Sequence, residues 1–208
     1  GPDGLPFSLF KVAPKAMADL LLSLLLRILE AGRWPRQLAC ARTIPIKKAG
    51  NREGLSGHRP ITILCAIRRI LESVILKALK PVEEALFAAQ RGFRNGIAGV
   101  AECVTVANAV IESGRPYVMA AIDLTNAYGS CQHGALSHII KSILGEDHVG
   151  AVLMSGLQIT TEITVDDWHS GLIEIKSGVP QGSCLSPLWF SLALDSILRR
   201  VDAMDKGF

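Results

Sequence analysis

One change of pattern near the C-terminal end constrains the fold of this sequence more than any other feature. Residues 159–178 alternate apolar and polar side chains on either side of a polar turn, which predicts a β-hairpin. Residues 177–187 (SGVPQGSCLSP) then form a loop of small and turn-forming residues. Beyond it, Ser186 and Pro187 can cap and begin a helix whose apolar side chains recur at helical spacing as far as Val201. A hairpin that leads into a helix predicts an α+β fold with a mainly antiparallel sheet packed with helices.

Helices and strands also alternate along the rest of the chain. Apolar spacing, with Pro or Gly near the ends, predicts four helices, over 14–31, about 64–80, about 98–113 and 133–144. The apolar run YVMAAID (117–123) predicts a buried strand that ends on Asp123. The 208 residues, of which 49% are hydrophobic, can bury about 70% of the unfolded surface, so we expect one domain or two closely packed lobes.

The charges are unevenly distributed along the chain. Residues 1–100 hold 16 Lys and Arg against 7 Asp and Glu (+9), whereas residues 101–208 hold 6 against 12 (−6), which together give the net charge of +3. This asymmetry indicates a basic lobe that faces polyanions and an acidic lobe that can hold cations. Two ordinary solvated faces explain the same charges equally well.

Neither a membrane span nor a disulfide framework is expected. The apolar run Leu20–Leu26 is much shorter than the ~18–20 residues that cross a bilayer, so it predicts a buried helix and no membrane partner. The five cysteines form no CxxC pair and no Cys/His cluster. They therefore indicate reduced thiols inside a cell, without a zinc site or a disulfide-linked partner.

Two stretches combine residue types that favour chemistry over packing. A carboxylate at the end of an apolar strand, as expected for Asp123, is costly unless it is paired or bound to a metal ion, although a strand-end turn is the simpler alternative. In the loop, Gly178 and Gly182 let the backbone approach a ligand, and Gln181 offers both a donor and an acceptor. A plain hairpin-to-helix connection explains the glycines, but it does not explain Gln181.

The sequence around these residues resembles the reverse transcriptases. AIDLTNAY (121–128) is similar to their first catalytic motif and GVPQGSCLSPLWF (178–190) to their Pro-Gln-Gly motif, in the correct order; we call 177–187 the Pro-Gln-Gly loop. The upstream blocks are similar to those of the non-LTR retrotransposon class: GPDGLP, GRWP, ARTIPIKKAG, HRPITIL and QRGFRNG. The resemblance covers nearly the whole chain. Group II intron proteins share several blocks, so a reverse transcriptase of that type is an alternative.

By this resemblance the chain is a fingers and palm fragment of a right-hand polymerase. Residues 1–115 would form a basic, fingers-like lobe with an N-terminal helical extension. Residues 116–208 would form a partial palm with the first catalytic motif and the Pro-Gln-Gly loop, which ends before the Asp-Asp motif. The implied function is RNA-directed DNA polymerase, with an RNA template, a DNA primer and dNTP as partners and an intracellular, nuclear location.

The resemblance also implies a role for each candidate residue. Asp123, helped by the carbonyl of Leu124, would bind two Mg²⁺ ions, or Mn²⁺ in their place. Tyr128 would stack under the deoxyribose. The remaining candidates would contact the nucleotide: Lys47 or Lys48 together with Arg59 at the β- and γ-phosphates, the backbone of Asn126 and Ala127 at the triphosphate, and Gln181 with Gly182 at the incoming nucleotide and template.

Three features depart from the family pattern or stay outside it. Gly129 stands where family members usually place an Asp, and no aromatic-x-Asp-Asp motif follows the Pro-Gln-Gly loop. TVDDW (164–168) precedes that loop and predicts a hairpin turn, so we expect the fragment to be inactive in isolation. Asp195 and Asp202 share one helix face, which predicts a solvated surface. A non-catalytic nucleic-acid-binding or scaffold module derived from a reverse transcriptase is the alternative function.

Overall fold

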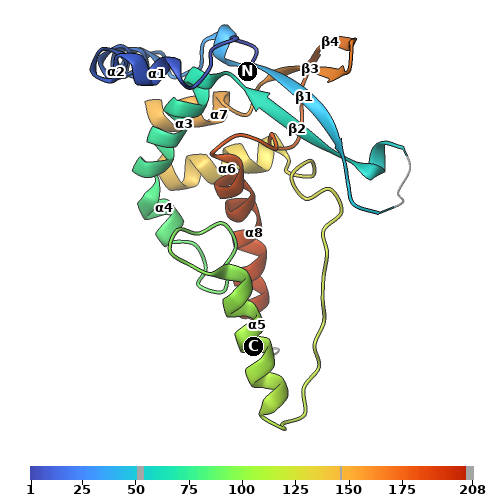
Figure 1. Cartoon of the computed structure of the whole chain (residues 1–208). Helices are drawn as coiled ribbons and strands as arrows, with labels where there is room; N and C mark the ends of the chain where they lie inside the picture. Colours follow the sequence, from blue (N-terminus) through green and yellow to red (C-terminus); the bar gives the residue numbers. More distant parts are fainter. Residues whose placement is uncertain (51–53, 146, 205–208) are drawn as a thin grey trace.

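The computed structural model describes residues 1–50, 54–145 and 147–204, which form a four-stranded sheet with helices packed beside it. The strands are β1 (Cys40–Lys47), β2 (His58–Leu64), β3 (Thr160–Val165) and β4 (Trp168–Glu174). The α-helices are α1 (Leu9–Val12), α2 (Pro14–Ala31), α3 (Ala66–Ala78), α4 (Lys80–Glu84), α5 (Gly99–Glu112), α6 (His133–Leu144), α7 (His148–Ser155) and α8 (Ser186–Asp202). Two short 3-10 helices are η1 (Arg36–Leu38) and η2 (Leu55–Gly57). Figure 1 shows the sheet at the upper right of the molecule, with α3 and α7 to its left, α6 beneath α7 and α8 running downward.

The sheet has the strand order β2-β1-β3-β4. β1 pairs antiparallel with β2 and parallel with β3, and β3 pairs antiparallel with β4, so the prediction of a mainly antiparallel sheet is confirmed. On its buried face the Thr43 hydroxyl lies 3.2 Å from that of Thr62 and 2.9 Å from that of Thr161. These hydrogen bonds join three neighbouring strands and satisfy polar groups that burial would otherwise leave unpaired.

The two faces of the β1–β2 hairpin differ in chemistry. Its pairs run from Ala41 opposite Leu64 to Lys47 opposite His58. Directly opposed residues share a face and successive residues alternate between faces. The face with Ala41 and Leu64 packs against Ile159. The opposite face carries Arg42, Ile44, Ile46, Arg59, Ile61 and Ile63.

The main core lies among the helices below the sheet. Side chains from α2, α3, α6, α7 and α8 meet there, and they include Ile28, Leu71, Leu136, Val152 and Leu188. Leu136 and Val152 are completely buried. Because Val179 and Leu185 of the Pro-Gln-Gly loop belong to this core, the core holds that loop against the helices.

The helix predictions are confirmed to within a few residues. Residues 14–31 and 133–144 are helical with the predicted ends, and the helix predicted over 98–113 spans Gly99–Glu112. The helix predicted over about 64–80 spans Ala66–Ala78 and ends before Pro81, as expected. Pro81 itself stands in the first turn of the next helix, α4, where its missing N–H costs nothing. Ser186 does not cap α8; its hydroxyl donates to the carbonyl oxygen of Pro180 at 2.8 Å.

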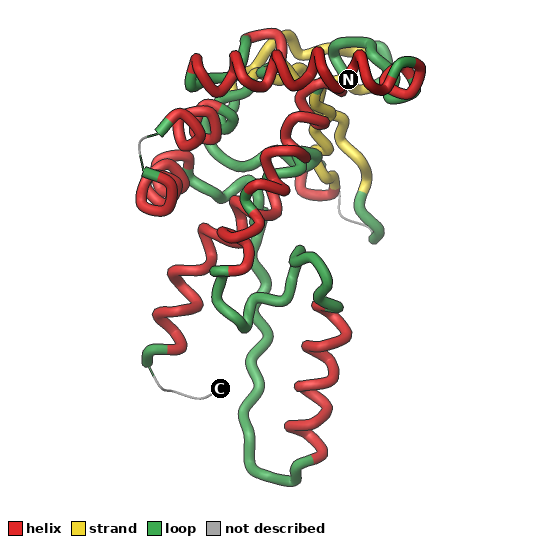
Figure 2. The backbone as a smooth tube through the Cα atoms, turned by 90° about the vertical axis from the view of Figure 1, so that its left-hand side faces the viewer, coloured by secondary structure: helices red, strands yellow, loops and turns green. Residues whose placement is uncertain are grey.

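The predicted strand over 117–123 is wrong. The segment has no regular secondary structure, and Val118 and Ile122 are 99% and 86% exposed. A strand is stable only when neighbouring strands pair with its backbone, and within the described ranges no strand lies beside this segment. Figure 2 shows α5 and the chain that follows it projecting from the rest of the molecule.

The N-terminal helix is less buried than its sequence indicates. Of α2, only Leu25 and Ile28 are buried, and Leu20, Leu22 and Leu26 are half or more exposed, so the prediction of a buried helix is wrong for this stretch. None of the described helices is both long enough and apolar enough to cross a membrane. The five cysteines are free thiols.

Candidate active site

Backbone hydrogen bonds join two loops that lie far apart in the sequence. The amide of Val179 donates to the carbonyl oxygen of Tyr128 at 2.9 Å. The amide of Gly178 donates to the carbonyl oxygen of Cys131 at 2.7 Å. The turn at 125–131, called the motif turn below, and the Pro-Gln-Gly loop therefore form one continuous wall.

The close approach of these loops depends on glycine at position 178. Gly178 has a φ of 87°, and a Cβ there would lie 2.9 Å from the Cα of Gly129. Because this neighbour is backbone, the two loops would have to separate to admit a side chain at position 178. Gly129 stands where the resemblance leads one to expect an Asp. The atoms nearest to a Cβ there belong to the end of the Asn126 side chain, which can turn away, so packing does not by itself require glycine at position 129.

The Pro-Gln-Gly loop is also tied to the sheet. The amide of Thr62 on β2 donates to the carbonyl oxygen of Gln181 at 2.9 Å, and Gln181 forms a parallel β-bridge with Ile61. Gly182, with a φ of 151°, passes so close that a Cβ would collide with the carbonyl oxygen of Thr62. The contact with β2 therefore requires glycine at position 182, whether or not a ligand lies on the other side of the loop.

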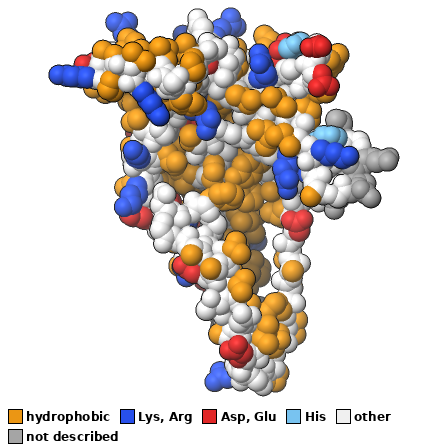
Figure 3. Space-filling view, viewed as in Figure 1, with side chains coloured by type: hydrophobic (Ala, Val, Ile, Leu, Met, Phe, Trp, Pro, Cys, Tyr) orange, Lys and Arg blue, Asp and Glu red, His pale blue; other side chains and the backbone are white. Residues whose placement is uncertain are grey.

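A pocket of about 430 Å³ opens where the motif turn, the Pro-Gln-Gly loop and β2 meet. Its lining contains four of the residues predicted from the sequence and four that were missed: Ala127, Tyr128, Gln181 and Gly182, and Ile61, Phe93, Ser183 and Pro187. Figure 3 shows apolar side chains gathered in the centre of this face, with Lys and Arg side chains to the right, where Figure 1 has the β1–β2 hairpin.

The wall of the pocket at Tyr128 is aromatic. The half-buried Tyr128 ring lies 5.5 Å from that of Phe190 and 6.5 Å from that of Phe93, measured between centroids. Burial, with a smaller contribution from Cys131, raises the pKa of the Tyr128 hydroxyl. The hydroxyl is therefore neutral at physiological pH, and the ring offers a flat apolar surface with one polar end.

Phe93 is the most exposed aromatic residue of this group. It has a positive φ of 57° and is 72% exposed. Both oxygens of Glu83 hold the loop beyond it, because the backbone and side-chain nitrogens of Asn95 donate to them at 2.8 and 3.2 Å. The signal for Phe93 in the sequence is an aromatic residue in the glycine-flanked block QRGFRNG, one of the blocks that carry the resemblance.

Asp195 anchors the beginning of the same loop from α8. Its carboxylate accepts from the amide of Phe87 at 2.7 Å and from Gln90 Nε2 at 2.8 Å, and it pairs with Arg199 at 2.6 Å. Burial alone would raise the pKa of Asp195, but the hydrogen bonds from Arg199, Phe87 and Gln90 outweigh it, so the pKa is lowered. The prediction of a solvated face is therefore wrong for Asp195.

The register of the hairpin separates the candidate cations. Arg59 is exposed and lies on the same face of β2 as Ile61, which lines the pocket. Lys47 is paired with His58 and lies on the opposite face. Lys48 follows the last residue of β1, so strand alternation does not place its side chain, and its Nζ donates to the Ser56 carbonyl oxygen at 2.9 Å. The register therefore places Lys47 on the face opposite Arg59 and leaves the face of Lys48 open.

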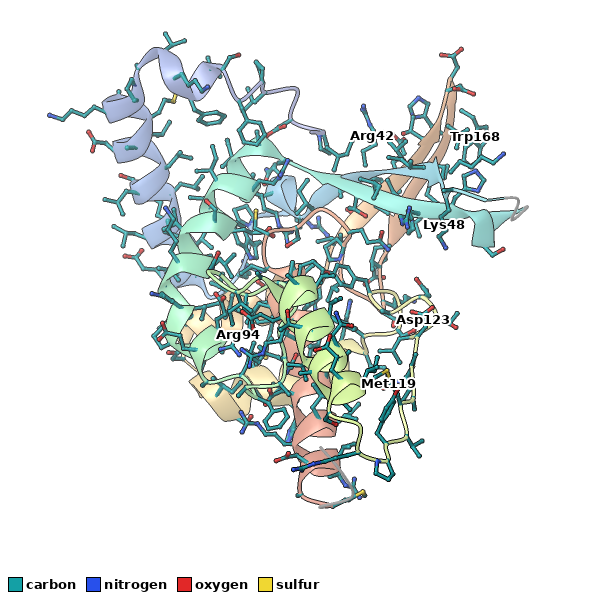
Figure 4. All side chains as sticks on the ribbon, turned by 60° about the horizontal axis from the view of Figure 1, so that its bottom comes forward. Arg42, Lys48, Arg94, Met119, Asp123 and Trp168 are labelled. Carbon is teal, nitrogen blue, oxygen red and sulfur yellow. The ribbon has the colours of Figure 1, made fainter. Side chains whose placement is uncertain are left out.

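Asp123 and Leu124 are exposed and do not belong to the pocket lining. Figure 4 shows Asp123 on the segment between α5 and the motif turn and Lys48 on the β1–β2 hairpin, both toward the right of the view. No group of three or more His, Cys, Asp or Glu side chains gathers anywhere in the described ranges. A single exposed carboxylate fits one position in the oxygen shell of Mg²⁺, which usually keeps several waters and substrate oxygens, but it is not a complete protein site.

The family follows from a direct comparison. Residues 46–205 match the family model described as reverse transcriptase (RNA-dependent DNA polymerase). The chain belongs to the reverse transcriptase family. This match covers the end of β1, all of β2, the motif turn and the Pro-Gln-Gly loop, and the resemblance found from the sequence is confirmed.

Relatives of this reverse transcriptase come from mobile elements. It is 30% identical over 173 residues to a Pol polyprotein from the type-1 retrotransposable element R2 of Popillia japonica, covering 80% of this chain and 24% of the relative. It is 28% identical over 200 residues to the RNA-directed DNA polymerase from mobile element jockey of Drosophila melanogaster, covering 92% and 22%. The chain thus spans about a quarter or less of the length of these relatives, and the non-LTR class expected from the sequence is confirmed.

The fold has a counterpart among solved structures. The structure of apo telomerase from Candida tropicalis, truncated from the C-terminal domain, aligns with a TM-score of 0.50 and 15% sequence identity over 82% of this chain and 40% of that chain. This likeness concerns the fold alone, and it agrees with the α+β architecture expected from the sequence.

Proposed function

We propose that this chain forms the dNTP-binding part of an RNA-directed DNA polymerase that acts on an RNA template and a DNA primer. The observation that carries the proposal is the pocket in which Tyr128, Gln181 and Gly182 converge beside the face of β2 that carries Arg59. A flat aromatic ring, exposed loop backbone and a neighbouring cation match the sugar, base and phosphate parts of a nucleotide.

In the proposed arrangement each part of the pocket acts on a different part of the substrate. Tyr128 supports the sugar, and the Gln181–Gly182 backbone lies against the base pair. Arg59 and Lys48 neutralise the phosphates, whose charge grows during transfer. Asp123 and the Leu124 carbonyl would hold Mg²⁺, which lowers the pKa of the primer hydroxyl and neutralises the triphosphate when bound.

The proposal is tested in the complete protein that carries these residues. Asp123→Ala should abolish primer extension and leave the Kd for template–primer nearly unchanged, because a metal ligand acts on the reaction and not on the nucleic-acid backbone. Asp167→Ala, in the β3–β4 turn, is the matched control and should leave extension unchanged. An equal loss of template binding in Asp123→Ala would instead indicate a structural role.

A second measurement separates the polymerase from a non-catalytic module. The described residues supply one carboxylate near the motif turn, so we expect the 208-residue chain alone not to extend a primer. The complete protein should extend one in the presence of Mg²⁺ or Mn²⁺. If it binds template–primer but never incorporates dNTP, the scaffold alternative is correct. A nuclear location belongs to the same proposal and is tested by imaging the tagged complete protein.

A further inference from the structure

A buried ion pair on α3 ends at the Pro-Gln-Gly loop. Glu72 is completely buried, and its Oε1 accepts from Arg68 Nε at 2.9 Å. Its second oxygen, Oε2, accepts from the Ser183 hydroxyl at 2.8 Å and from the Cys184 amide at 3.0 Å. One carboxylate therefore joins the helix to the two residues that directly follow Gln181 and Gly182.

The other end of this ion pair is held equally firmly. Arg68 Nη1 donates to the carbonyl oxygen of Leu38 at 3.2 Å and Nη2 donates to that of Gly156 at 2.7 Å. The guanidinium lies over the Trp34 ring, 5.0 Å from its centroid. Since Arg68 is fixed by groups before β1 and after α7, the position of the Glu72 carboxylate is fixed as well.

Ser183 links the fixed Glu72 carboxylate to the backbone of the Pro-Gln-Gly loop. Its hydroxyl donates to Glu72 and accepts from the amide of Leu185 at 3.1 Å, so one buried side chain orders the backbone on both sides of Cys184. Together with the bond from Thr62 to Gln181, the segment 181–185 is held from β2 on one side and from α3 on the other.

We propose that Glu72 is a positioning residue, which sets the place of the Gln181–Gly182 backbone against the incoming nucleotide without touching that nucleotide. The inference rests on the proposed function, because that function supplies the nucleotide. The anchor, meaning the hydrogen bonds from Ser183 and Cys184 to Glu72, does not depend on the proposed function. A carboxylate suits the task because both of its oxygens accept hydrogen bonds. A glutamine of the same shape offers one acceptor and one donor, so it can satisfy either Arg68 or the loop, but not both.

The test compares Glu72→Gln with the unchanged complete protein. Arg68 is always charged and can only donate, so the glutamine should turn its oxygen toward Arg68 and its NH2 group toward the loop. Hydrogen exchange of the Cys184 amide should then become at least about tenfold faster, because the amide loses its acceptor. The KM for dNTP should rise at least about tenfold, while the Kd for template–primer stays within about twofold. Ser73→Ala on the same helix is the matched control: its hydroxyl donates only to the Ile70 carbonyl, and it should change neither quantity.

Glu72→Gln leaves Arg68 without its charged partner and can therefore lower the stability of the protein. A second pair of variants, at Ser183, tests the same proposal with the ion pair intact. Ser183→Ala keeps the ion pair and the bond from the Cys184 amide to Glu72, and it removes the Ser183 hydroxyl that joins Glu72 to the Leu185 amide. It should raise Cys184 exchange and the dNTP KM by about threefold. Ser183→Thr keeps the hydroxyl and should restore both. A merely structural role would lower stability in Ser183→Ala without changing KM.

The outcomes distinguish the two proposals. Unchanged Cys184 exchange in both Glu72→Gln and Ser183→Ala overturns the anchor, whatever the protein does with nucleotides. Faster exchange with an unchanged dNTP KM also overturns the positioning role. If the unchanged protein binds no dNTP at all, the proposed function fails and the role of Glu72 toward the nucleotide fails with it.

Discussion

The amide of Val179 donates to the carbonyl oxygen of Tyr128 across 51 positions of the sequence at 2.9 Å. This bond makes the aromatic residue of the motif turn and the start of the Pro-Gln-Gly loop parts of one wall. Because Gln181 in the same loop is bound to Thr62, a displacement of either loop changes the shape of the whole pocket. Variants on the two loops should therefore be coupled rather than additive.

Tyr128 is expected to select against ribonucleotides. Its ring, supported by Phe190, would lie beneath the sugar of the nucleotide, where a 2′-hydroxyl collides with it. Tyr128→Ala should raise the rNTP/dNTP ratio of kcat/KM by at least about tenfold, which is ~1.4 kcal/mol of discrimination. The ratio is measured with both substrates on one RNA template.

Tyr128→Phe is the matched control for this experiment. It keeps the ring and its contact with Phe190, so the rNTP/dNTP ratio should stay as in the unchanged protein. If Tyr128→Ala instead lowers both activities in parallel and leaves the ratio unchanged, the ring serves only to pack the motif turn against the core.

Gly182 is expected to tolerate no side chain. In Gly182→Ala the new Cβ would collide with the Thr62 carbonyl at a φ of 151°, so the loop must leave β2 or the chain must lose stability by about 1–3 kcal/mol. Primer extension should fall in either case. Gly134→Ala in α6 is the control: a Cβ there meets no atom within 4 Å, and helix propensity should stabilise the chain by up to about 1 kcal/mol. The melting temperatures of both variants are measured by thermal unfolding. Equal melting temperatures for Gly182→Ala and Gly134→Ala would contradict the prediction that position 182 requires glycine.

The sequence predicted local structure well, and it failed where a residue depends on distant partners. Helices over 14–31 and 133–144 were predicted with their ends because each helix satisfies its own backbone. The apolar run 117–123 shows the limit of such reasoning, since a strand needs partners that its own residues do not specify.

The same limit applies to the candidate site. Tyr128, Gln181 and Gly182 were recognised through short motifs, and the structure brings them together. Glu72 and Asp195 act through contacts 111 and 108 positions away, with Ser183 and Phe87, and no local pattern distinguishes them from ordinary helix acids. Lys47 and Lys48 were equivalent in the sequence, and only the register of β1 with β2 places Lys47 on the face opposite Arg59.

Arg59 and Lys48 are expected to act on the nucleotide phosphates. Arg59→Ala should raise the KM for dNTP about tenfold and lower kcat, because a fixed cation stabilises charge that grows during transfer. Lys48→Ala should act in the same direction, and Lys47→Ala, on the opposite face of the hairpin, should have a smaller effect. Lys77→Ala on α3 is the control, because it also removes an exposed charge. Steady-state kinetics with varied dNTP measures all four, and an unchanged KM in Arg59→Ala would refute its assignment.

Asp195 should make the loop before Phe93 sensitive to acid. Its pKa is lowered in the folded protein from an ordinary value of 3.8, so its contribution to stability is fully present above that pH and is lost as the pH falls through the lowered value. Asp195→Asn should lower the free energy of unfolding by about 1–2 kcal/mol at pH 7, because the amide cannot serve Phe87, Gln90 and Arg199 together.

The difference between Asp195→Asn and the unchanged protein should be constant between pH 7 and about pH 5 and should shrink below pH 3.8, where the native carboxylate also takes up a proton. Asp202→Asn, which changes an exposed acid in the last turn of the same helix, is the control, and its effect at pH 7 should stay within about 0.5 kcal/mol. Urea unfolding at stepped pH measures the three proteins. A difference that persists unchanged into strong acid would show that Asp195 supports the loop by shape and not by charge, and the hydrogen bonds to Phe87 and Gln90 would then not depend on its ionisation.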